Sequence, residues 1–478
     1  MPEFHSRFEK IDRRVPIDEH NCAVQFDVTK CKNCTLCRRA CADTQTVLDY
    51  YSLSSTGDMP ICVHCGQCSS ACPFGAIVEV NDVDKVKAAL KDPEKIVIFQ
   101  TAPAVRVGLG EAFGMDPGTF VEGKMVAALR TLGADYVFDT DFGADLTIME
   151  EATELLHRLQ SEEIPIPQFT SCCPAWVEFA ETFYPDLLQH LSSTKSPISI
   201  LSPVIKTYFA QQKNIDPKKI VNVCVTPCTA KKAEIRRPEL SAAGLFWDEP
   251  EIRDTDICIT TRELAQWIQD ENIDFANLED GQFDKAFGEA SGGGRIFGNS
   301  GGVMEAAIRT AYHMFTGRPA PKDFIPFEPV RGLQGVKKAT VIFGHFVLHV
   351  AAISGLGNAR AFIDDPHDLR SLSRLLPPGL LGLRLWRRRR RRPAESQTAA
   401  GQESPGSPHR FAVQERRRYG RQSQLAEPGN RRTLRSLPRR TAVGNGRIHL
   451  AHLLLRQERP AGPHEEPHAP DQPHVAEV

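Results

Sequence analysis

The sequence predicts three regions in order: a small cysteine-rich α+β domain, an α/β body built on parallel β-sheets, and a disordered tail rich in arginine and proline. Eight of the nine cysteines within residues 21–82 are closely spaced. Short apolar runs then alternate with amphipathic stretches as far as residue 363, the pattern of strands followed by helices. Beyond residue 365 the chain contains neither cysteine nor lysine. We therefore divide the 478 residues into a leader segment (1–20), a first domain (21–82), a body (83–363) and a tail (364–478).

The cysteines of the first domain form two runs with C-x-x-C-x-x-C-x-x-x-C spacing. The runs are Cys31, Cys34, Cys37 and Cys41, and then Cys62, Cys65, Cys68 and Cys72. In two-cluster ferredoxins three cysteines of such a run bind one four-iron cluster and the fourth binds the other. We therefore predict a ferredoxin-like domain with two 4Fe-4S clusters, one bound by Cys31, Cys34, Cys37 and Cys72, the other by Cys62, Cys65, Cys68 and Cys41. Two zinc sites are the alternative, but a third cysteine at C-x-x-C spacing in each run disfavours them.

The body shows the alternation of a parallel α/β fold. Apolar runs at 95–99, 136–138, 220–225 and 257–259 are typical of buried strands. Helical spacing at 83–90, 124–132, 150–159 and 262–269 separates or flanks them. In such folds the functional loops leave the carboxyl ends of the strands.

Two turns of the body contain the remaining cysteines of chemical interest. Residues 169–176 (FTSCCPAW) and 225–234 (VTPCTAKKAE) each pass from an apolar run through a cysteine turn into a helical pattern. A thiolate just ahead of a helix is favoured by the free backbone N–H groups there, and thiolates are the ligands that iron–sulfur chemistry requires. Both turns resemble cluster-binding signatures of the iron-only (di-iron) hydrogenases, which make or oxidise H₂. The resemblance runs with gaps from about residue 21 to 363 and implies two α/β lobes with a cluster between them.

The resemblance also implies roles for individual residues of the two turns. Cys173 and Cys228 would bind the active-site cluster, a four-iron cube linked to a di-iron unit. Cys172 would stay free and deliver protons, which a thiol with a reference pKa of about 8.5 can do. Lys231 would contact a cyanide of the cluster. Two alternatives remain open: Cys172 is a second ligand or an inert buried thiol, and the lysine pair at 231–232 is a solvated patch.

A proton path and a glycine-rich segment complete the resemblance. Glu151, Glu154 and Ser192 match the family's proton path, although two glutamates three residues apart more often mark a solvent-facing helix. The glycines of residues 289–305 permit close backbone approach to a bound cluster. A nucleotide-binding loop is disfavoured there because the Gly-Lys-Ser/Thr sequence is missing. Cys224 and Cys258 lie in strand-like runs and are predicted to be core residues.

The resemblance stops near residue 363, before the family's third signature. That signature contributes two more cysteines, one of which bridges the cube to the di-iron unit, whereas this chain has no cysteine after Cys258. Six arginines (387–392) followed by Pro393 and Ala394 stand there instead. Glycine, Gln and Pro codons read two bases out of frame would yield that run, so we predict a frameshift. A nucleic-acid or nuclear-targeting patch is the alternative.

The functional hypothesis is an iron-only hydrogenase that reversibly reduces protons to H₂. Electrons would come from a ferredoxin-type carrier through the two four-iron clusters, and hydrogenase maturation proteins would build the active-site cluster. The alternative is a non-catalytic electron-transfer or cluster-assembly scaffold protein. Closely spaced cysteines, with no secretory leader or membrane span visible, indicate a cytoplasmic protein without membrane or nucleic-acid partners. The missing ligands raise the expectation that the chain as written is inactive.

Overall fold

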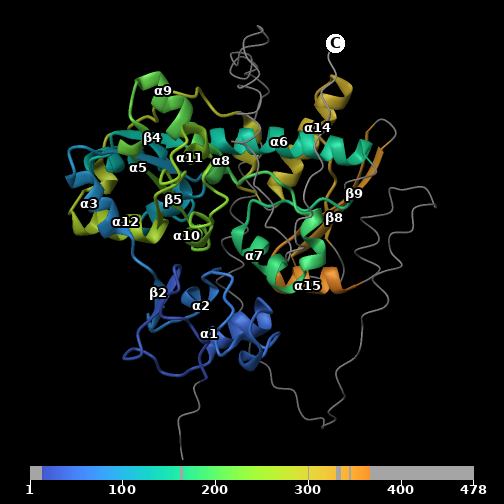
Figure 1. The fold of residues 1–478 in the computed structure, drawn as a ribbon, viewed down its shortest axis with the longest axis horizontal. Coiled ribbons are helices and arrows are strands. Elements are labelled where there is room, and N and C mark those ends of the chain that lie inside the picture. Colours follow the sequence, from blue (N-terminus) through green and yellow to red (C-terminus); the bar gives the residue numbers. More distant parts are fainter. Residues whose placement is uncertain (1–12, 162–164, 300, 330–334, 344–345, 366–478) are drawn as a thin grey trace, which may run out of the picture.

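The computed structural model describes residues 13–161, 165–299, 301–329, 335–343 and 346–365 (Figure 1). Most of the predicted leader and all but the first two residues of the arginine-rich tail, with its proposed frameshift and disorder, lie outside these residues. Within them, a small cysteine-rich part lies below two larger lobes in the view of Figure 1. Among the helices of the described segments, none combines the length and apolar character needed to cross a membrane.

The small part contains two structurally repeated cysteine loops. Strand β1 (Val24–Phe26) pairs antiparallel with β2 (Ile77–Glu79). Each loop leads into a short helix, α1 (Leu36–Arg39) or α2 (Gln67–Ser70), and η1 (Ala40–Thr44) and η2 (Leu53–Thr56) lie between them. Asn33 and His64 have φ values of 54° and 55°, and Thr35 and Gly66 have 72° and 69°. The two runs of the sequence therefore take the same backbone path.

The first lobe is built on a four-stranded parallel sheet of order β4-β3-β5-β6. Its strands are β3 (Ile96–Thr101), β4 (Tyr136–Asp139), β5 (Ile220–Thr226) and β6 (Ile257–Thr260), which confirms the four predicted strands. Three helices agree closely with the predicted ranges: α3 (Val83–Lys91), α5 (Glu122–Thr131) and α12 (Thr261–Asp270). Helix α6 (Asp141–Gln160) is twice as long as the predicted helix.

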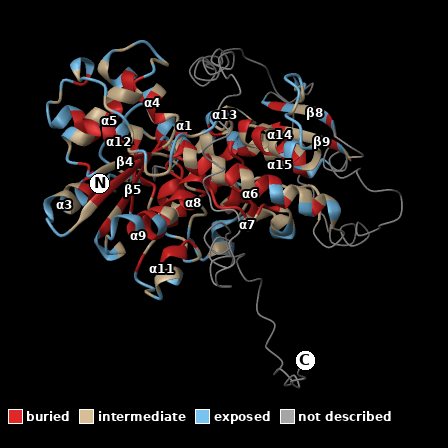
Figure 2. Ribbon diagram, turned by 90° about the horizontal axis from the view of Figure 1, so that it is seen from above, coloured by how far each residue is buried: buried red, intermediate tan, exposed pale blue. Residues whose placement is uncertain are grey.

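Helices cover both faces of this sheet. Val97 and Phe99 pack against α3, α5, α12, α4 (Val105–Gly108), η3 (Leu109–Phe113) and η7 (Phe275–Asn277). Ile98 points to the opposite face because side chains alternate along a strand. It packs there against α8 (Pro197–Val204), η5 (Ile205–Phe209) and α9 (Ala210–Lys213), with η6 (Pro217–Lys219) leading into β5. Figure 2 shows buried residues gathered around β5 and α8, and Cys224 and Cys258 are core residues as predicted.

The second lobe differs from the prediction of parallel sheets. It contains α13 (Gly292–Ile296), α14 (Gly302–Thr316), α15 (Leu356–Asp364) and the sheet β7 (Glu328–Pro329), β8 (Val336–Phe343) and β9 (Phe346–Ile353). The sheet is antiparallel throughout. Only two residues separate β8 from β9, and so short a connection can join only antiparallel strands. The C-terminal half of α6 packs on this sheet together with α14.

The order of the parallel strands reverses between β3 and β5. From β3 the chain continues to β4 on one side, whereas β5 continues to β6 on the other side. The loops that follow β3 and β5 lie side by side, and the Ala102 N–H donates a 2.9 Å hydrogen bond to the Val225 carbonyl. Open α/β sheets bind ligands outside the carboxyl ends of their strands at such a reversal. Cys228 lies on the loop after β5.

Candidate functional site

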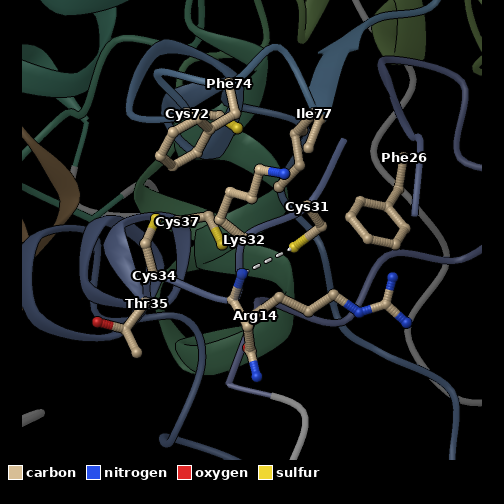
Figure 3. A pocket seen from close by; sticks show the side chains of 12 residues that line it. Arg14, Phe26, Cys31, Lys32, Cys34, Thr35, Cys37, Cys72, Phe74 and Ile77 are labelled. Carbon is tan, nitrogen blue, oxygen red and sulfur yellow. Dashed lines mark hydrogen bonds between the residues drawn. The ribbon is translucent and has the colours of Figure 1, made fainter. Parts of the chain in front are cut away.

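The first group of four cysteines surrounds one pocket. Cys31, Cys34, Cys37 and Cys72 line a hollow with about 330 Å³ of empty space, partly open to solvent. Figure 3 shows their sulfur atoms gathered around it, with Lys32 and Phe74 at its rim. The Asn33 N–H donates to Cys31 Sγ at 3.4 Å, the dashed line of Figure 3. The structure thus brings together the four cysteines that the sequence assigned to one cluster.

Backbone N–H groups favour thiolates in this group. The Val15 N–H donates to Cys37 Sγ at 3.4 Å. Burial raises the pKa of the Cys72 thiol, but the N–H groups of residues 74–77 outweigh burial and the net pKa is lowered. Hydrogen bonds to sulfur stabilise the charged form that binds iron and also tune the reduction potential of a cluster.

The second group consists of Cys41, Cys62, Cys65 and Cys68. Burial, with the charge of Cys62 as an additional cause, raises the pKa of Cys41 to about 11 and that of Cys65 to about 12. Burial also raises the pKa of Cys68, as do the charges of the other three cysteines. Such mutual influence requires the four thiols to share one space. Cys41 therefore joins the second run, as the crossed ligand pattern predicts.

The chemistry of both groups fits four-iron clusters. In the described segments, no group of three or more His, Cys, Asp or Glu side chains is arranged around a single metal ion. A four-iron cluster instead takes one thiolate at each of four separate irons. Four thiols around a common space, with N–H donors to sulfur, match that requirement.

Cys173 and Cys228 lie together beside the second group. Cys173 is the N-cap residue of α7 (Pro174–Phe183), which is followed by η4 (Pro185–His190), and Cys228 precedes α10 (Lys231–Glu234). Burial raises the pKa of Cys228 to about 11, and the charge of Cys173 is the next largest cause. The charge of Cys228 also acts on Cys65. The structure therefore places the two predicted ligands in one neighbourhood, next to the inner of the two four-cysteine groups.

Lys231 and Lys232 are buried, so the solvated-patch interpretation is wrong. The Lys231 ammonium group donates a 3.0 Å hydrogen bond to the Cys172 carbonyl and forms an ion pair with Glu234. Burial lowers the pKa of Lys231, but the charge and hydrogen bond of Glu234, together with the charges of Cys228 and Cys172, outweigh it and the net pKa is raised. Lys232 instead pairs with Asp82 at 2.7 Å, which joins the loop to the end of the small part.

Cys172 is half-buried and lies near the buried Glu151. Burial raises the pKa of the Cys172 thiol well above its ordinary value, and the charge of Glu151 raises it further. Burial raises the pKa of Glu151 to about 8, with the charge of Glu154 as the second cause. Neither carboxylate oxygen of Glu151 has a hydrogen-bond partner in the described part of the chain, although the Ser171 backbone and the Ser192 side chain lie near enough to act against the rise in its pKa.

Ser192 and Glu154 continue the buried polar chain. The Ser192 hydroxyl donates a 2.7 Å hydrogen bond to Glu154 Oε2. Glu151 and Glu154 are 1% and 7% exposed, so the interpretation as a solvent-facing helix is wrong. The structure adds Arg158, which is 1% exposed and donates to Glu154 Oε1 at 2.8 and 3.2 Å. Its position four residues after Glu154 on α6 was the available sequence signal.

The glycine-rich segment is tied to α6. The Ser291 N–H and the Gly294 N–H donate to the Asp145 carboxylate at 2.6 and 2.9 Å, and the Gly293 N–H donates to the Ser291 hydroxyl at 3.0 Å. These three N–H groups are therefore bonded within the protein. The expected approach of glycine N–H groups to a cluster is not supported at Gly293 and Gly294.

Two family profiles match the chain. The profile described as the C-terminal domain of the iron only hydrogenase large subunit matches residues 95–370. The profile of a 4Fe-4S binding domain matches residues 58–78. The first match covers more than half of the chain.

Curated relatives include hydrogenases and assembly proteins. The NADP-reducing hydrogenase subunit HndD of Solidesulfovibrio fructosivorans is 47% identical over 70% of this chain and 59% of its own length. Iron hydrogenase 1 of Clostridium pasteurianum is 44% identical over 74% and 62%. The cytosolic iron-sulfur assembly component 3 of Bos taurus is 30% identical over 63% and 64%. The chain thus spans about three fifths of the length of the two hydrogenase relatives.

A solved structure has a similar fold. A structure reported for stepwise H-cluster assembly in an FeFe-hydrogenase superposes with a TM-score of 0.61 and 33% identity. The superposition covers 80% of this chain and 99% of that chain.

Proposed function

Because the chain belongs to the iron-only hydrogenase family, we propose that its described part is the electron-transfer and catalytic body of an enzyme that interconverts protons and H₂. The observation that carries the proposal is the buried polar chain that ends beside two converging cysteines. Cys228 lies on the loop at the strand reversal and is influenced by the charge of Cys173, and the charges of Glu151 and Cys173 act on Cys172. Reversible hydrogen chemistry needs both electrons and protons at one buried point.

Electrons would pass through the small part in a defined order. The group around Cys34 opens to solvent, whereas Cys65 of the second group is a neighbour of Cys228. A ferredoxin-type carrier would therefore reduce the outer 4Fe-4S cluster, and the inner cluster would pass the electron onward. Residues 21–82 would form this ferredoxin-like domain and residues 83–363 the hydrogenase body. Free cysteine thiols and exposed clusters favour a reducing, cytoplasmic location.

Protons would move along α6 and the turn beside it. Cys172 has a raised pKa and holds its proton at neutral pH, whereas Glu151, with a pKa of about 8, can be either protonated or charged. A group whose pKa lies near the working pH is suited to proton exchange. The Ser192 hydroxyl, hydrogen-bonded to Glu154, extends the path. Lys231 orients the turn through the Cys172 carbonyl.

The third metal site is incomplete in this chain. Cys173 and Cys228 supply two thiolates, but a four-iron cube takes four, and no cysteine follows Cys258. When complete, the active-site cluster would supply the iron at which hydrogen is bound. We infer that the chain as written binds the two clusters of the small part, and that maturation proteins could not complete the third site without the missing ligands.

A non-catalytic scaffold is the second candidate. The missing ligands and the assembly-protein relatives, 26–30% identical, favour it. The buried path through Glu151, Ser192 and Glu154 favours the enzyme, because an electron-transfer scaffold does not need to move protons inward.

The test combines metal content, gas evolution and gene sequence. Anaerobic reconstitution of this chain should give about eight irons and no H₂. Reading the gene beyond codon 360 in another frame should reveal paired cysteines before a glycine run, and the frame-restored chain, matured and reduced, should evolve H₂. Cys172→Ala in the restored chain should abolish gas without lowering the iron content. A restored chain that binds all its iron but evolves no H₂ would support the scaffold function. A gene without such a reading frame would contradict the proposed frameshift in the tail.

A further inference from the structure

The sheet of the second lobe has an edge that no described strand covers. Its order is β7-β8-β9, so β9 (Phe346–Ile353) lies at an edge along its whole length. The chain passes from β9 directly into α15, whose Phe362 packs on one face of the sheet near Val336 and Ile353. Figures 1 and 2 both show β8 and β9 at the outer side of this lobe.

This edge presents the backbone groups of four residues. The Ser354 N–H donates a 2.9 Å hydrogen bond to the Gly335 carbonyl, in register with the pairing of β8 and β9. Hydrogen-bonded pairs alternate in an antiparallel ladder, so every second residue counted back from Ser354 bonds to β8. The residues between them turn their N–H and C=O groups to the edge: Val347, His349, Ala351 and Ile353. In the described part of the chain, none of these groups has a hydrogen-bond partner.

The opposite edge of the sheet is protected, whereas the β9 edge is not. Strand β7 ends in Pro329 and pairs with Lys337 and Lys338 of β8, and proline and lysine block further pairing at natural sheet edges. Strand β9 reads FVLHVAAI and contains no proline, glycine, lysine, arginine or acidic residue. Val347 is 38% exposed, and its cross-strand neighbour Ile342 is 64% exposed. A long apolar edge of this kind pairs readily with a further strand.

We propose that β9 pairs antiparallel with β9 of a second copy of this chain. A register centred on Val350 places Val347 opposite Ile353 and His349 opposite Ala351. Each of the four residues that face the edge then bonds to a residue that also faces it. A two-fold interface requires such self-complementarity, and no like charges meet across the two strands. The two sheets become one continuous sheet, in which neither copy keeps an open β9 edge.

The apolar side chains complement each other in the same register. Helix α15 covers the sheet face near Ile353, whereas the face at Ile342 and Val347 is exposed. Antiparallel pairing brings the exposed end of each copy beside the covered end of the other. Val347 then packs against Ile353 of the second copy, and β-branched pairs across strands stabilise a sheet. This interface needs no metal cluster, so it is independent of the proposed function.

The experiment measures self-association of the full chain after anaerobic reconstitution. Sedimentation velocity over a series of concentrations gives the dimer Kd at low and high salt. The variant is Val347→Lys, which places a charge on the paired edge. The matched control is Ile342→Lys, at a more exposed position on the same face but on β8, one strand away from the edge. Far-UV circular dichroism checks that both variants keep the fold.

The unmodified chain should form a dimer that persists at high salt, because screening does not weaken backbone hydrogen bonds or apolar contacts. Val347→Lys should raise the dimer Kd at least about tenfold, and Ile342→Lys should change it less than about threefold.

A photo-cross-linker locates the interface even if Val347→Lys fails to fold. Val347→p-benzoylphenylalanine, in a mixture of unlabelled and heavy-nitrogen chains, should cross-link to residues 346–364 of a chain of the other isotope. Three results would overturn the proposal: a monomer at every concentration, equal weakening by both lysine variants, or a dimer that dissociates at high salt. Cross-links confined to residues 366–478 of the same chain would also overturn it, because the tail would then occupy the edge.

Discussion

The backbone of Gly66 lies directly against the side chain of Thr229. A Cβ atom added at Gly66 would be 2.5 Å from Thr229 Oγ1. The same hydroxyl donates a 2.7 Å hydrogen bond to the carbonyl of His64. One threonine therefore joins the inner four-cysteine loop to the loop that carries Cys228.

Gly66→Ala should loosen this junction. Gly66 has a φ of +69°, which costs an L-residue about 1–2 kcal/mol, and the new methyl group would also displace the Thr229 hydroxyl from His64. We expect the free energy of unfolding, measured in urea, to fall by roughly 2–4 kcal/mol. Gly75→Ala is the matched control, because Gly75 has a φ of +60° but its added Cβ would meet nothing within 4 Å. If Gly66→Ala and Gly75→Ala lowered the free energy of unfolding equally, the contact between Gly66 and Thr229 would contribute nothing to stability.

Glu151→Gln should change how stability depends on pH. The folded-state pKa of Glu151 is raised to about 8 from an ordinary value of 4.5. Between these two pH values the folded protein keeps a proton on Glu151 that the unfolded chain has released. The stabilising effect of this proton is complete below about pH 4.5 and is lost as pH rises toward 8. The slope is at most about 1.4 kcal/mol per pH unit. Glu151→Gln should remove this loss and be more stable than the unmodified chain at pH 8.

The measurement for Glu151 is chemical denaturation between pH 5 and 8. Glu279→Gln, at an exposed position, serves as the control and should leave the pH profile unchanged. Parallel profiles for Glu151→Gln and the unmodified chain would contradict a buried, proton-binding Glu151.

Glu154→Leu should destabilise the fold strongly, because it leaves the buried Arg158 without its ion-pair partner. The Arg158 side chain is fully buried, and its only carboxylate partner in the described segments is Glu154. Removing one member of a buried ion pair costs about 3–5 kcal/mol because the other charge stays buried. Replacing both residues, Glu154→Leu with Arg158→Met, should cost less than Glu154→Leu alone. A double variant with the full sum of both single losses in urea denaturation would contradict the coupling.

Arg360 holds α15 to the small part through an aromatic cage. Its guanidinium carbon lies 4.0 Å from the Tyr50 ring centroid and 4.8 and 4.7 Å from those of Phe179 and Phe183. The group also donates to the Thr46 carbonyl at 2.8 Å and the Thr46 hydroxyl at 3.0 Å.

Arg360→Lys should therefore fail to replace Arg360. Lysine keeps the charge but loses the planar fork that stacks on rings and donates twice. We expect a loss of about 1–3 kcal/mol for Arg360→Lys and a similar or larger loss for Arg360→Ala, read from the Tm and from faster proteolysis within α15. If Arg360→Lys were as stable as the unmodified chain, a positive charge at position 360 would be sufficient to hold α15 in place.

The sequence by itself determined the features that depend on local spacing. The repeated cysteine runs predicted both ligand groups, including the crossing of Cys41 and Cys72, because each run is a short loop whose backbone repeats. The sequence also predicted the four parallel strands, because a buried strand is marked by a short apolar run. The family followed from two local turns around Cys173 and Cys228.

Only the tertiary structure decided which features are buried and which groups are neighbours. Lys231, Glu151 and Glu154 have the sequence pattern of solvated residues, and packing of distant segments around α6 and α10 buries them. The spacing of the cysteines in the sequence does not show which four-cysteine group lies beside Cys228. Cys65 of the inner group lies there because Gly66 contacts Thr229, which is 163 positions further along the chain. The second sheet is antiparallel for a similar reason: a pattern of apolar runs specifies strands, but their direction is decided by the length of the connection and by what packs against them.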